Sequence, residues 1–287
     1  MQHLEDRVAV VTGAASGIGR ALSIHLAERE GMEVVLVDVD PQVHHVADEL
    51  RASGRRVTAR ETDISSNSAV EALAKHTVAR HAGLHLLCNV AAVGGPARMS
   101  TLSLADWRWT LGVNLWGVVH LQHHFLPILL EQDEGHIVNT ASVAPFMAKP
   151  YMGPYRASKA AIVTLTETLY LELAAEQSSV GVSLLCPGPT ATALADDERN
   201  APQELTRRDS LDDSPEVESH RQELRERMRH GMPPEEVAAT TVEAIREPRL
   251  YILPYRGSND LMRRRLDRIL AERDPPLDET DDLPLPE

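Results

Sequence analysis

The chain has 287 residues, of which 43% are hydrophobic, and its formal net charge is −14. This length and composition can bury a sizeable core and predict one α/β domain with added segments. The negative charge argues against nucleic acid or an anionic membrane as a partner. No apolar run reaches membrane-spanning length and the first residues lack the form of a signal peptide, so we expect a cytoplasmic protein.

The first predicted element is a buried strand at 7–12, and it leads directly into a glycine-rich turn, G-A-A-S-G-I-G, at 13–19. Apolar residues at helical spacing follow at 21–30 and stop at Gly31, a residue type that ends helices. Glycines in such a turn let the backbone approach a pyrophosphate, whose charge is stabilised at the start of the next helix. The order of strand, turn and helix therefore indicates a dinucleotide site.

The second predicted strand, 33–38, ends in Asp38. A carboxylate at this place in a dinucleotide-binding sheet accepts hydrogen bonds from the adenosine ribose, and it repels the extra phosphate of NADP. The next residues, Val39 and Asp40, supply no cation to offset that repulsion. We therefore predict NAD as the cofactor, with an NADPH-dependent ketone reductase as the alternative.

The rest of the chain alternates helices and strands, as expected for a parallel sheet. We predict helices at 42–53, 67–81, 106–131 and 154–177 and from 233, and strands at 56–61, 84–89, 135–140, 180–186 and 250–253. The predicted fold is a single Rossmann-type, doubly wound parallel sheet of about seven strands with helices on both faces. Its domain spans 1–257, and a C-terminal helix with an acidic, proline-rich tail occupies 258–287.

Three side chains near the fifth strand indicate acid/base chemistry. Tyr155 and Lys159 lie four residues apart near the start of a predicted helix, so their side chains share one helix face. A phenol titrates at about pH 10, and a neighbouring cation lowers that pKa, which makes Tyr155 a usable general acid/base. Ser142, just past the strand at 135–140, can hydrogen-bond the same substrate oxygen. Tyr and Lys at this spacing are otherwise an ordinary surface pair, so the interpretation depends on the other motifs.

Together the motifs resemble those of the short-chain dehydrogenase/reductase family over about residues 5–192 and 233–254. They are T-G-x-x-x-G-I-G at 12–19, Asp38, Asp63, Asn89, Asn114, the set of Ser142, Tyr155 and Lys159, and Pro187-Gly188 followed by Thr190 and Thr192. Each motif is modestly specific by itself, whereas all of them in family order and spacing are highly specific.

The resemblance implies reversible oxidation of a secondary alcohol to a ketone, with Tyr155 moving the hydroxyl proton and Ser142 holding the oxygen. It also implies that Lys159 lowers the Tyr155 pKa and binds the nicotinamide ribose, and that Asn114 bends its helix and holds a water in the proton path. The residues implied to bind the cofactor are Gly13, Ser16, Gly17, Ile18, Gly19, Asp38, Asp63, Ile64, Asn89, Ala91, Tyr155, Lys159, Pro187, Gly188, Thr190 and Thr192. A non-catalytic dinucleotide-binding protein is the alternative from another class, and the complete Ser/Tyr/Lys/Asn set argues against it.

The sequence departs from the family where N-N-A-G appears as Asn89-Val90-Ala91-Ala92. Val90 removes a polar group that normally braces the sheet, and Ala92 places a methyl group near the nicotinamide ribose. We interpret both changes as tolerated variation.

The candidate substrate residues are mostly apolar, which favours a hydrophobic or aromatic alcohol. They are Val93, Gly94, Ser142, Val143, Phe146, Met147, Met152 and Leu194. Residues 193–230 contain few apolar side chains, so we expect them to form a lid-like insertion over the substrate without a core of their own.

An apolar face on the helix at 154–177 and the basic helix at 259–273 favour a homodimer or homotetramer, and the family resemblance implies that the helix at 106–131 also lies at a subunit interface. His120, His123 and His124 have metal-like spacing, but we assign no metal because the family needs none on this helix. Cys88 and Cys186 lie in apolar strands and are predicted to be small buried hydrophobes rather than disulfide partners.

Overall fold

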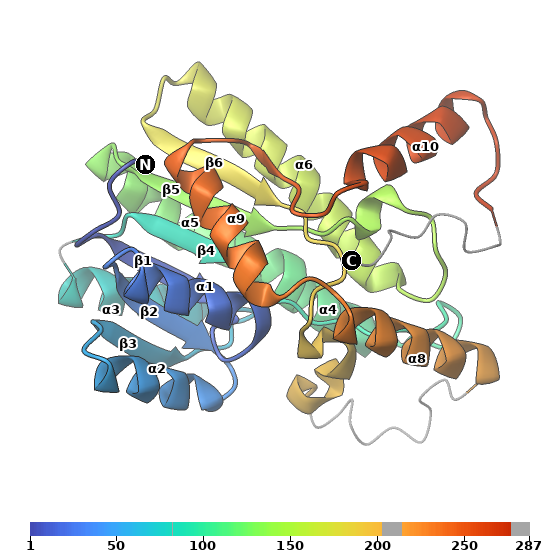
Figure 1. The fold of residues 1–287 in the computed structure, drawn as a ribbon, viewed down its shortest axis with the longest axis horizontal. Helices are drawn as coiled ribbons and strands as arrows, with labels where there is room; N and C mark the ends of the chain where they lie inside the picture. Colours follow the sequence, from blue (N-terminus) through green and yellow to red (C-terminus); the bar gives the residue numbers. More distant parts are fainter. Residues whose placement is uncertain (82, 203–213, 277–287) are drawn as a thin grey trace.

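The structure is a computed structural model that describes residues 1–81, 83–202 and 214–276. Its centre is one sheet of seven parallel strands in the order β3-β2-β1-β4-β5-β6-β7 (Figure 1). The strands are β1 (Val8–Thr12), β2 (Glu33–Asp38), β3 (Val57–Glu61), β4 (Leu86–Asn89), β5 (Gly135–Thr140), β6 (Val180–Leu185) and β7 (Tyr251–Ile252). The predicted fold is therefore confirmed. The strand order changes direction between β1 and β4, which is where such sheets bind ligands.

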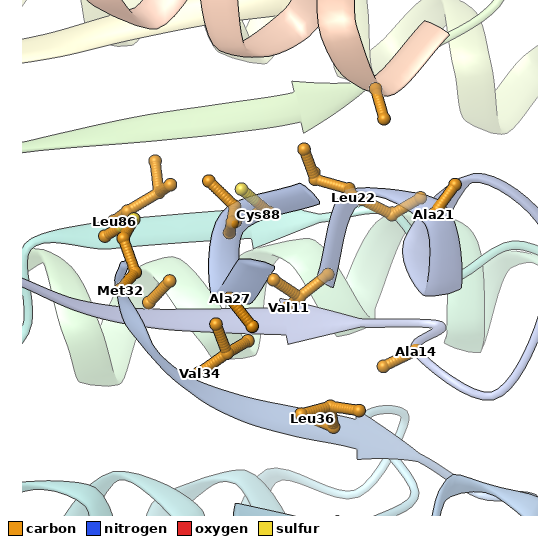
Figure 2. Close-up of a cluster of buried hydrophobic side chains, with 14 of the residues drawn as sticks. Val11, Ala14, Ala21, Leu22, Ala27, Met32, Val34, Leu36, Leu86 and Cys88 are labelled. Carbon is orange, nitrogen blue, oxygen red and sulfur yellow. The ribbon is translucent and has the colours of Figure 1, made fainter. Parts of the chain in front are cut away.

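Helices cover both faces of the sheet because every residue of the central strands is buried on one side or the other. In β1, Ala9 and Val11 pack toward α1 (Gly17–Glu28), α2 (Gln42–Ala52) and α9 (Pro234–Arg246). Figure 2 shows this core, in which Leu22 of α1 lies over the strands beside Leu86 and Cys88.

The alternate residues of β1, Val8 and Val10, pack on the opposite face. The helices there are α3 (Asn67–Arg80), α5 (Gly117–Gln132) and α6 (Gly153–Ala175). The two faces follow from the two-residue period of a strand. Cys88 and Cys186 are free and buried, as predicted.

The long helix predicted at 106–131 is present with an internal irregularity. It begins as α4 (Leu104–Leu111), widens into a π-helical turn, η1 (Gly112–Trp116), and continues as α5. Asn114 lies within the π turn, so the local change in the helix expected at this residue is confirmed. Ser103 and Asp106 cap the start of α4 reciprocally, which explains why the helix begins there.

Two helical segments occur where the sequence indicated an insertion without a core. They are η3 (Ala193–Asn200) and α8 (Pro215–Arg229), and α8 buries Val217 and Met228. The part of the predicted insertion at 203–213 lies outside the described residues.

The C-terminal helix is α10 (Ser258–Leu270), and the tail from 277 onward also lies outside the described residues. The division at residue 257 stays a prediction. No helix within the described ranges combines the length and apolar character that a membrane span requires.

Candidate active site

Two adjoining cavities lie at the carboxyl ends of the strands. The larger one, about 470 Å³, is bordered by the glycine-rich turn, the ends of β2, β4 and β5, and the loop after β6. The smaller one, about 120 Å³, lies between the residues after β5, the start of α6 and one face of α8. Both cavities are lined by Ser142, Tyr155, Gly188, Leu194 and Met228. Ser142 and Tyr155, two of the predicted acid/base residues, therefore lie where the larger and the smaller cavity meet.

The glycine-rich turn forms one end of the larger cavity. Gly13 and Gly17 have φ angles of +70° and +54°, which glycine adopts without strain. A Cβ atom on Gly17 would lie 2.9 Å from the Cγ2 atom of Thr192, so the loop after β6 touches the turn. Helix α1 begins at Gly17 inside the cavity, which points its N-terminal N–H groups toward the place expected for a pyrophosphate.

Asp38 lines the cavity at the end of β2 and also holds the glycine-rich turn. Its Oδ2 atom accepts a hydrogen bond of 2.9 Å from the Ala15 N–H, and its Oδ1 atom accepts one of 3.0 Å from the Asp40 N–H. Burial raises the pKa of Asp38, and these N–H donors oppose that shift. The carboxylate thus has a second role, bracing the turn, which the sequence did not indicate.

Asp63 and Ile64 follow β3 and line the same cavity. The Asp63 Oδ1 atom accepts hydrogen bonds from the backbone N–H of Ser65, at 2.9 Å, and from its hydroxyl, at 2.7 Å. The carbonyl oxygen of Ile64 lies 3.0 Å from Nδ1 of His120. The loop after β3 is therefore stabilised by hydrogen bonds within itself and by His120 of α5.

Asn89 lines neither of the two cavities, and its predicted cofactor role stays a prediction. It is buried in β4, where its Nδ2 atom donates to Oδ1 of Asn139 at 2.8 Å. Asn139 in turn donates to the hydroxyl of Thr166 at 3.0 Å. Because β4 is flanked on both faces, the Asn89 side chain points into the sheet packing and ties β4 to β5 and α6.

Thr12 supplies the polar brace that Val90 cannot provide. Its hydroxyl oxygen accepts hydrogen bonds from the N–H of Val90, at 3.0 Å, and of Ala91, at 3.2 Å. It also donates to the carbonyl of Cys88 at 3.4 Å. The connection between β1 and the end of β4 is therefore made by the threonine of the T-G motif, which explains how valine is accommodated at position 90.

Ser142, Tyr155 and Lys159 are all buried and line the larger cavity. The Ser142 hydroxyl oxygen accepts a hydrogen bond of 3.0 Å from the Ala144 N–H, which fixes the side chain at the end of β5. Lys159 Nζ donates to the Thr140 carbonyl at 2.8 Å and lies 5.8 Å from the centre of the Tyr155 ring. The predicted set is thus assembled on two neighbouring elements, β5 and α6.

The pKa of Tyr155 is shifted in the direction opposite to the one expected from the sequence. Burial raises the pKa of Tyr155, and a hydrogen bond with Ser142 opposes this shift only in part. Burial also lowers the pKa of Lys159 to about 8, which weakens the cation that was expected to stabilise a phenolate. Burial therefore favours the protonated phenol over the phenolate.

Asn114 is buried, lines neither cavity, and contacts residues that support the site. Its Oδ1 atom accepts from the Val93 N–H at 2.8 Å, and its Nδ2 atom donates to the Val93 carbonyl at 2.8 Å and to the Ser158 hydroxyl at 3.1 Å. The side chain thus joins the loop after β4 to the turn of α6 that carries Tyr155 and Lys159. A water relay through Asn114 stays a prediction.

The smaller cavity contains most of the predicted substrate residues. Those that line it are Ser142, Val143, Met147, Met152 and Leu194, and Val93 lines the larger cavity instead. Gly94 and Phe146 line neither cavity. A Cβ atom on Gly94 would lie 3.0 Å from the Tyr155 ring, so this glycine makes room for the ring. Phe146 packs behind the site against the cluster that contains Ile162 and Leu184.

The sequence did not indicate that α8 forms a wall of the smaller cavity. Its contributing residues are His220, Glu223, Leu224, Arg227 and Met228. Leu224 packs with Leu194 against the cluster of Met152 and Tyr155. The available signal was the spacing of Val217, Leu224 and Met228, which places them near one helix face, but the many charges around them obscured it.

Arg156, at the start of α6, is a further residue that the sequence did not single out. Its Nη1 atom donates to the carbonyls of Ala144, at 2.7 Å, and Met147, at 2.8 Å. It therefore holds the loop that follows Ser142, and it also lines the smaller cavity.

Two of the three histidines at 120, 123 and 124 contact residues of the segment around α3. His120 contacts the Ile64 carbonyl, and His124 Nε2 lies 2.9 Å from Oδ1 of Asn67. Within the described ranges, no three His, Cys, Asp or Glu side chains are grouped so that they could hold a metal ion.

Comparison with known proteins agrees with this geometry. A family model described as short chain dehydrogenase matches residues 7–203. The chain belongs to the short-chain dehydrogenase family. A crystal structure of a short-chain dehydrogenase/reductase from Burkholderia phymatum, in complex with NAD, is 41% identical and superimposes with a TM-score of 0.92, over 99% of this chain and all of that one.

Two curated relatives cover different extents of this short-chain dehydrogenase. A 1-deoxy-11-beta-hydroxypentalenate dehydrogenase from Streptomyces exfoliatus is 39% identical over 67% of this chain and 70% of that protein. A CLA biosynthesis dehydrogenase/reductase from Lactiplantibacillus plantarum is 28% identical over 96% of this chain and 97% of that protein. The similarity to the second protein therefore extends through α8 to the C-terminal region.

Proposed function

We propose that this short-chain dehydrogenase interconverts a secondary alcohol and a ketone, uses NAD, and acts on a hydrophobic or aromatic substrate. The observation that carries the proposal is the placement of Ser142 and Tyr155 on the walls of both cavities. The hydroxyl of an alcohol bound in the smaller cavity would contact the Ser142 and Tyr155 hydroxyls, next to the larger cavity, which suits a dinucleotide.

The residues of the larger cavity fit a dinucleotide. A side chain on Gly17 or Gly19 would clash with Thr192 or with the Gly13 carbonyl, so the close turn requires glycine, and the start of α1 suits a pyrophosphate. Of the predicted cofactor residues, all except Asn89 line this cavity. When bound, NAD supplies the hydride acceptor.

The chain's own residues manage the proton. In the direction of oxidation Tyr155 accepts the hydroxyl proton while Ser142 hydrogen-bonds the substrate oxygen, and in reduction Tyr155 returns the proton. Because burial raises the pKa of Tyr155, reduction uses the protonated phenol directly, whereas oxidation requires the phenol to release its proton before it accepts the one from the substrate hydroxyl. Lys159, which the Thr140 carbonyl holds in place, keeps a cation within reach of the phenol ring.

A hydrophobic substrate is supported by the lining of the smaller cavity. The apolar side chains that line it are Val143, Met147, Met152, Leu194, Leu224 and Met228. Burying an apolar group against such side chains contributes about 25 cal/mol for each Å² removed from water.

We expect NADH to bind at least about tenfold more tightly than NADPH, because the Asp38 carboxylate repels a phosphate at this end of the cavity. Lys159 is the one Lys or Arg among the described residues that line the larger cavity. It follows β5, which is three strands away from β2 and Asp38 in the sheet, so it cannot offset the repulsion at Asp38. Fluorescence titration of the purified protein with both nucleotides measures the preference, and turnover of a panel of secondary alcohols with NAD tests the reaction.

Replacing Asp38 with Ser and Val39 with Arg should shift the ratio of affinities toward NADPH by about tenfold or more. NADH binding should also weaken, because the Ala15 N–H loses its acceptor. Asp40→Ser is the matched control, since Asp40 is a neighbouring acid that does not line the cavity. Equal or tighter NADPH binding by the unmodified protein would contradict the NAD assignment and favour an NADPH-dependent ketone reductase.

Self-association and a cytoplasmic location stay predictions. The proposal of a homodimer or homotetramer is supported by exposed apolar side chains, which are Tyr170 and Leu171 on α6 and Leu266, Ile269 and Leu270 on α10.

A further inference from the structure

Tyr255 lies outside the family match at 7–203, yet its phenol joins two segments that border the active site. The hydroxyl donates a hydrogen bond of 2.6 Å to the Pro189 carbonyl. The same oxygen accepts a bond of 3.0 Å from the Met232 N–H. Burial raises the pKa of Tyr255, which keeps the phenol protonated and able to donate.

The two segments joined by this hydroxyl belong to different walls of the site. Pro189 lines the smaller cavity, and its neighbours Gly188 and Thr190 line the larger one. Met232 follows the end of α8, whose Leu224 and Met228 line the smaller one. The phenol therefore links the loop after β6, which borders both cavities, to the end of the helix that forms a wall of the smaller one.

The backbones of these segments are in direct contact. Thr190 and Met232 form a parallel bridge, in which the Ala191 N–H donates to the Met232 carbonyl and the Met232 N–H donates to the Pro189 carbonyl, both at 2.9 Å. A Cβ atom on Gly231 would lie 2.5 Å from the Pro189 oxygen, so the end of α8 approaches this loop as closely as backbone atoms allow.

The position of the Tyr255 ring is determined by the core and by α10. The ring packs with Val143 and Leu261, and Met147 and Met232 cover the cluster. The hydroxyl of Ser258, the first residue of α10, donates to the Tyr255 carbonyl at 2.9 Å. The phenol oxygen is thus a fixed point to which both segments attach.

We propose that Tyr255 is a positioning residue that ties the end of α8 to the loop after β6 and thereby holds the α8 wall of the substrate cavity over Ser142 and Tyr155. The kinetic consequence rests on the proposed function, whereas the attachment of α8 does not. Without the hydroxyl, α8 keeps its backbone bridge but loses a fixed anchor at its C-terminal end. The substrate would then meet a looser wall, while the glycine-rich turn and Asp38 stay in place.

The test is Tyr255→Phe, which keeps the ring in its cluster and removes only the hydroxyl. We expect KM for the alcohol to rise about fivefold, with kcat and the Kd for NADH within about threefold of wild type. Limited digestion with trypsin should cleave at Arg225, Arg227 and Arg229 of α8 about fivefold faster, with the global melting temperature lowered by only a few degrees. Tyr251→Phe is the matched control, because the Tyr251 hydroxyl bonds Glu167 on the exposed edge of the sheet.

Equal KM values and equal cleavage rates in Tyr255→Phe, Tyr251→Phe and wild type would overturn the inference. A fall in kcat with unchanged KM would also overturn it, since Tyr255 would then affect the chemical step and not the pocket wall. Loss of NADH binding together with a large fall in melting temperature would show a general structural role and would likewise count against it. If no alcohol is turned over by wild type, the proposed function fails, and the digestion rates still decide whether Tyr255 anchors α8.

Discussion

Replacing Tyr155 with Phe is expected to lower kcat for alcohol oxidation at least about 100-fold and to leave the Kd for NADH within about threefold of wild type. In the proposed mechanism the phenol oxygen exchanges the substrate proton, and Phe removes that oxygen while keeping the ring. Gly94 packs against the ring and Ser142 hydrogen-bonds the hydroxyl, so the loss should be confined to one atom. The larger cavity keeps the rest of its lining, which is why cofactor affinity should persist.

Steady-state kinetics with the best alcohol of the panel and fluorescence titration with NADH measure the two quantities separately. Tyr170→Phe is the matched control, because Tyr170 is on the same helix and is exposed far from both cavities. A Tyr155→Phe variant whose kcat stays within about tenfold of wild type would show that another group moves the proton.

Replacing Gly19 with Ala should weaken NADH binding by about 100-fold or more, because the added methyl group has no space. Its Cβ atom would lie 2.2 Å from the Gly13 carbonyl oxygen and 2.8 Å from the Thr12 carbonyl oxygen. Both obstacles are backbone atoms, so the glycine-rich turn itself must move. Gly13 has little room to move, because a Cβ atom placed on it would lie 3.0 Å from the backbone of Ala91.

The same overpacking should lower the free energy of unfolding by about 1–3 kcal/mol. Urea unfolding measures this effect and NADH titration measures the affinity. Gly54→Ala is the control: it has a φ of +79° and nothing within 4 Å of its added Cβ atom, so it should cost about 1 kcal/mol in stability and leave NADH binding unchanged. NADH affinity of Gly19→Ala within about tenfold of wild type would mean that the turn does not hold the pyrophosphate.

Much of the fold follows from local patterns. The apolar runs that become β1 and β2, and the helical spacing that becomes α1, are determined within a few residues by side-chain alternation and turn chemistry. The order of Ser142, Tyr155 and Lys159 along a strand and the following helix likewise places them together, because parallel strands end at one edge of the sheet.

The charge behaviour of these residues could not be predicted from spacing. A lysine one helical turn from Tyr155 was expected to lower the tyrosine pKa, but the surrounding core raises it and weakens the lysine as a cation. Desolvation depends on how many atoms from distant segments surround a group, and a helical repeat carries no information about that.

The sheet, the glycine-rich turn and the proximity of Ser142, Tyr155 and Lys159 could all be predicted from the amino-acid sequence, because each of them depends on neighbours in the chain. Long-range packing places Asn89 between β4 and β5, packs Phe146 against Ile162 and Leu184, makes α8 a wall of the smaller cavity, and brings the Tyr255 hydroxyl to Met232. Those contacts join segments far apart in the sequence. Their geometry depends on how whole helices pack against the sheet, which no local pattern specifies.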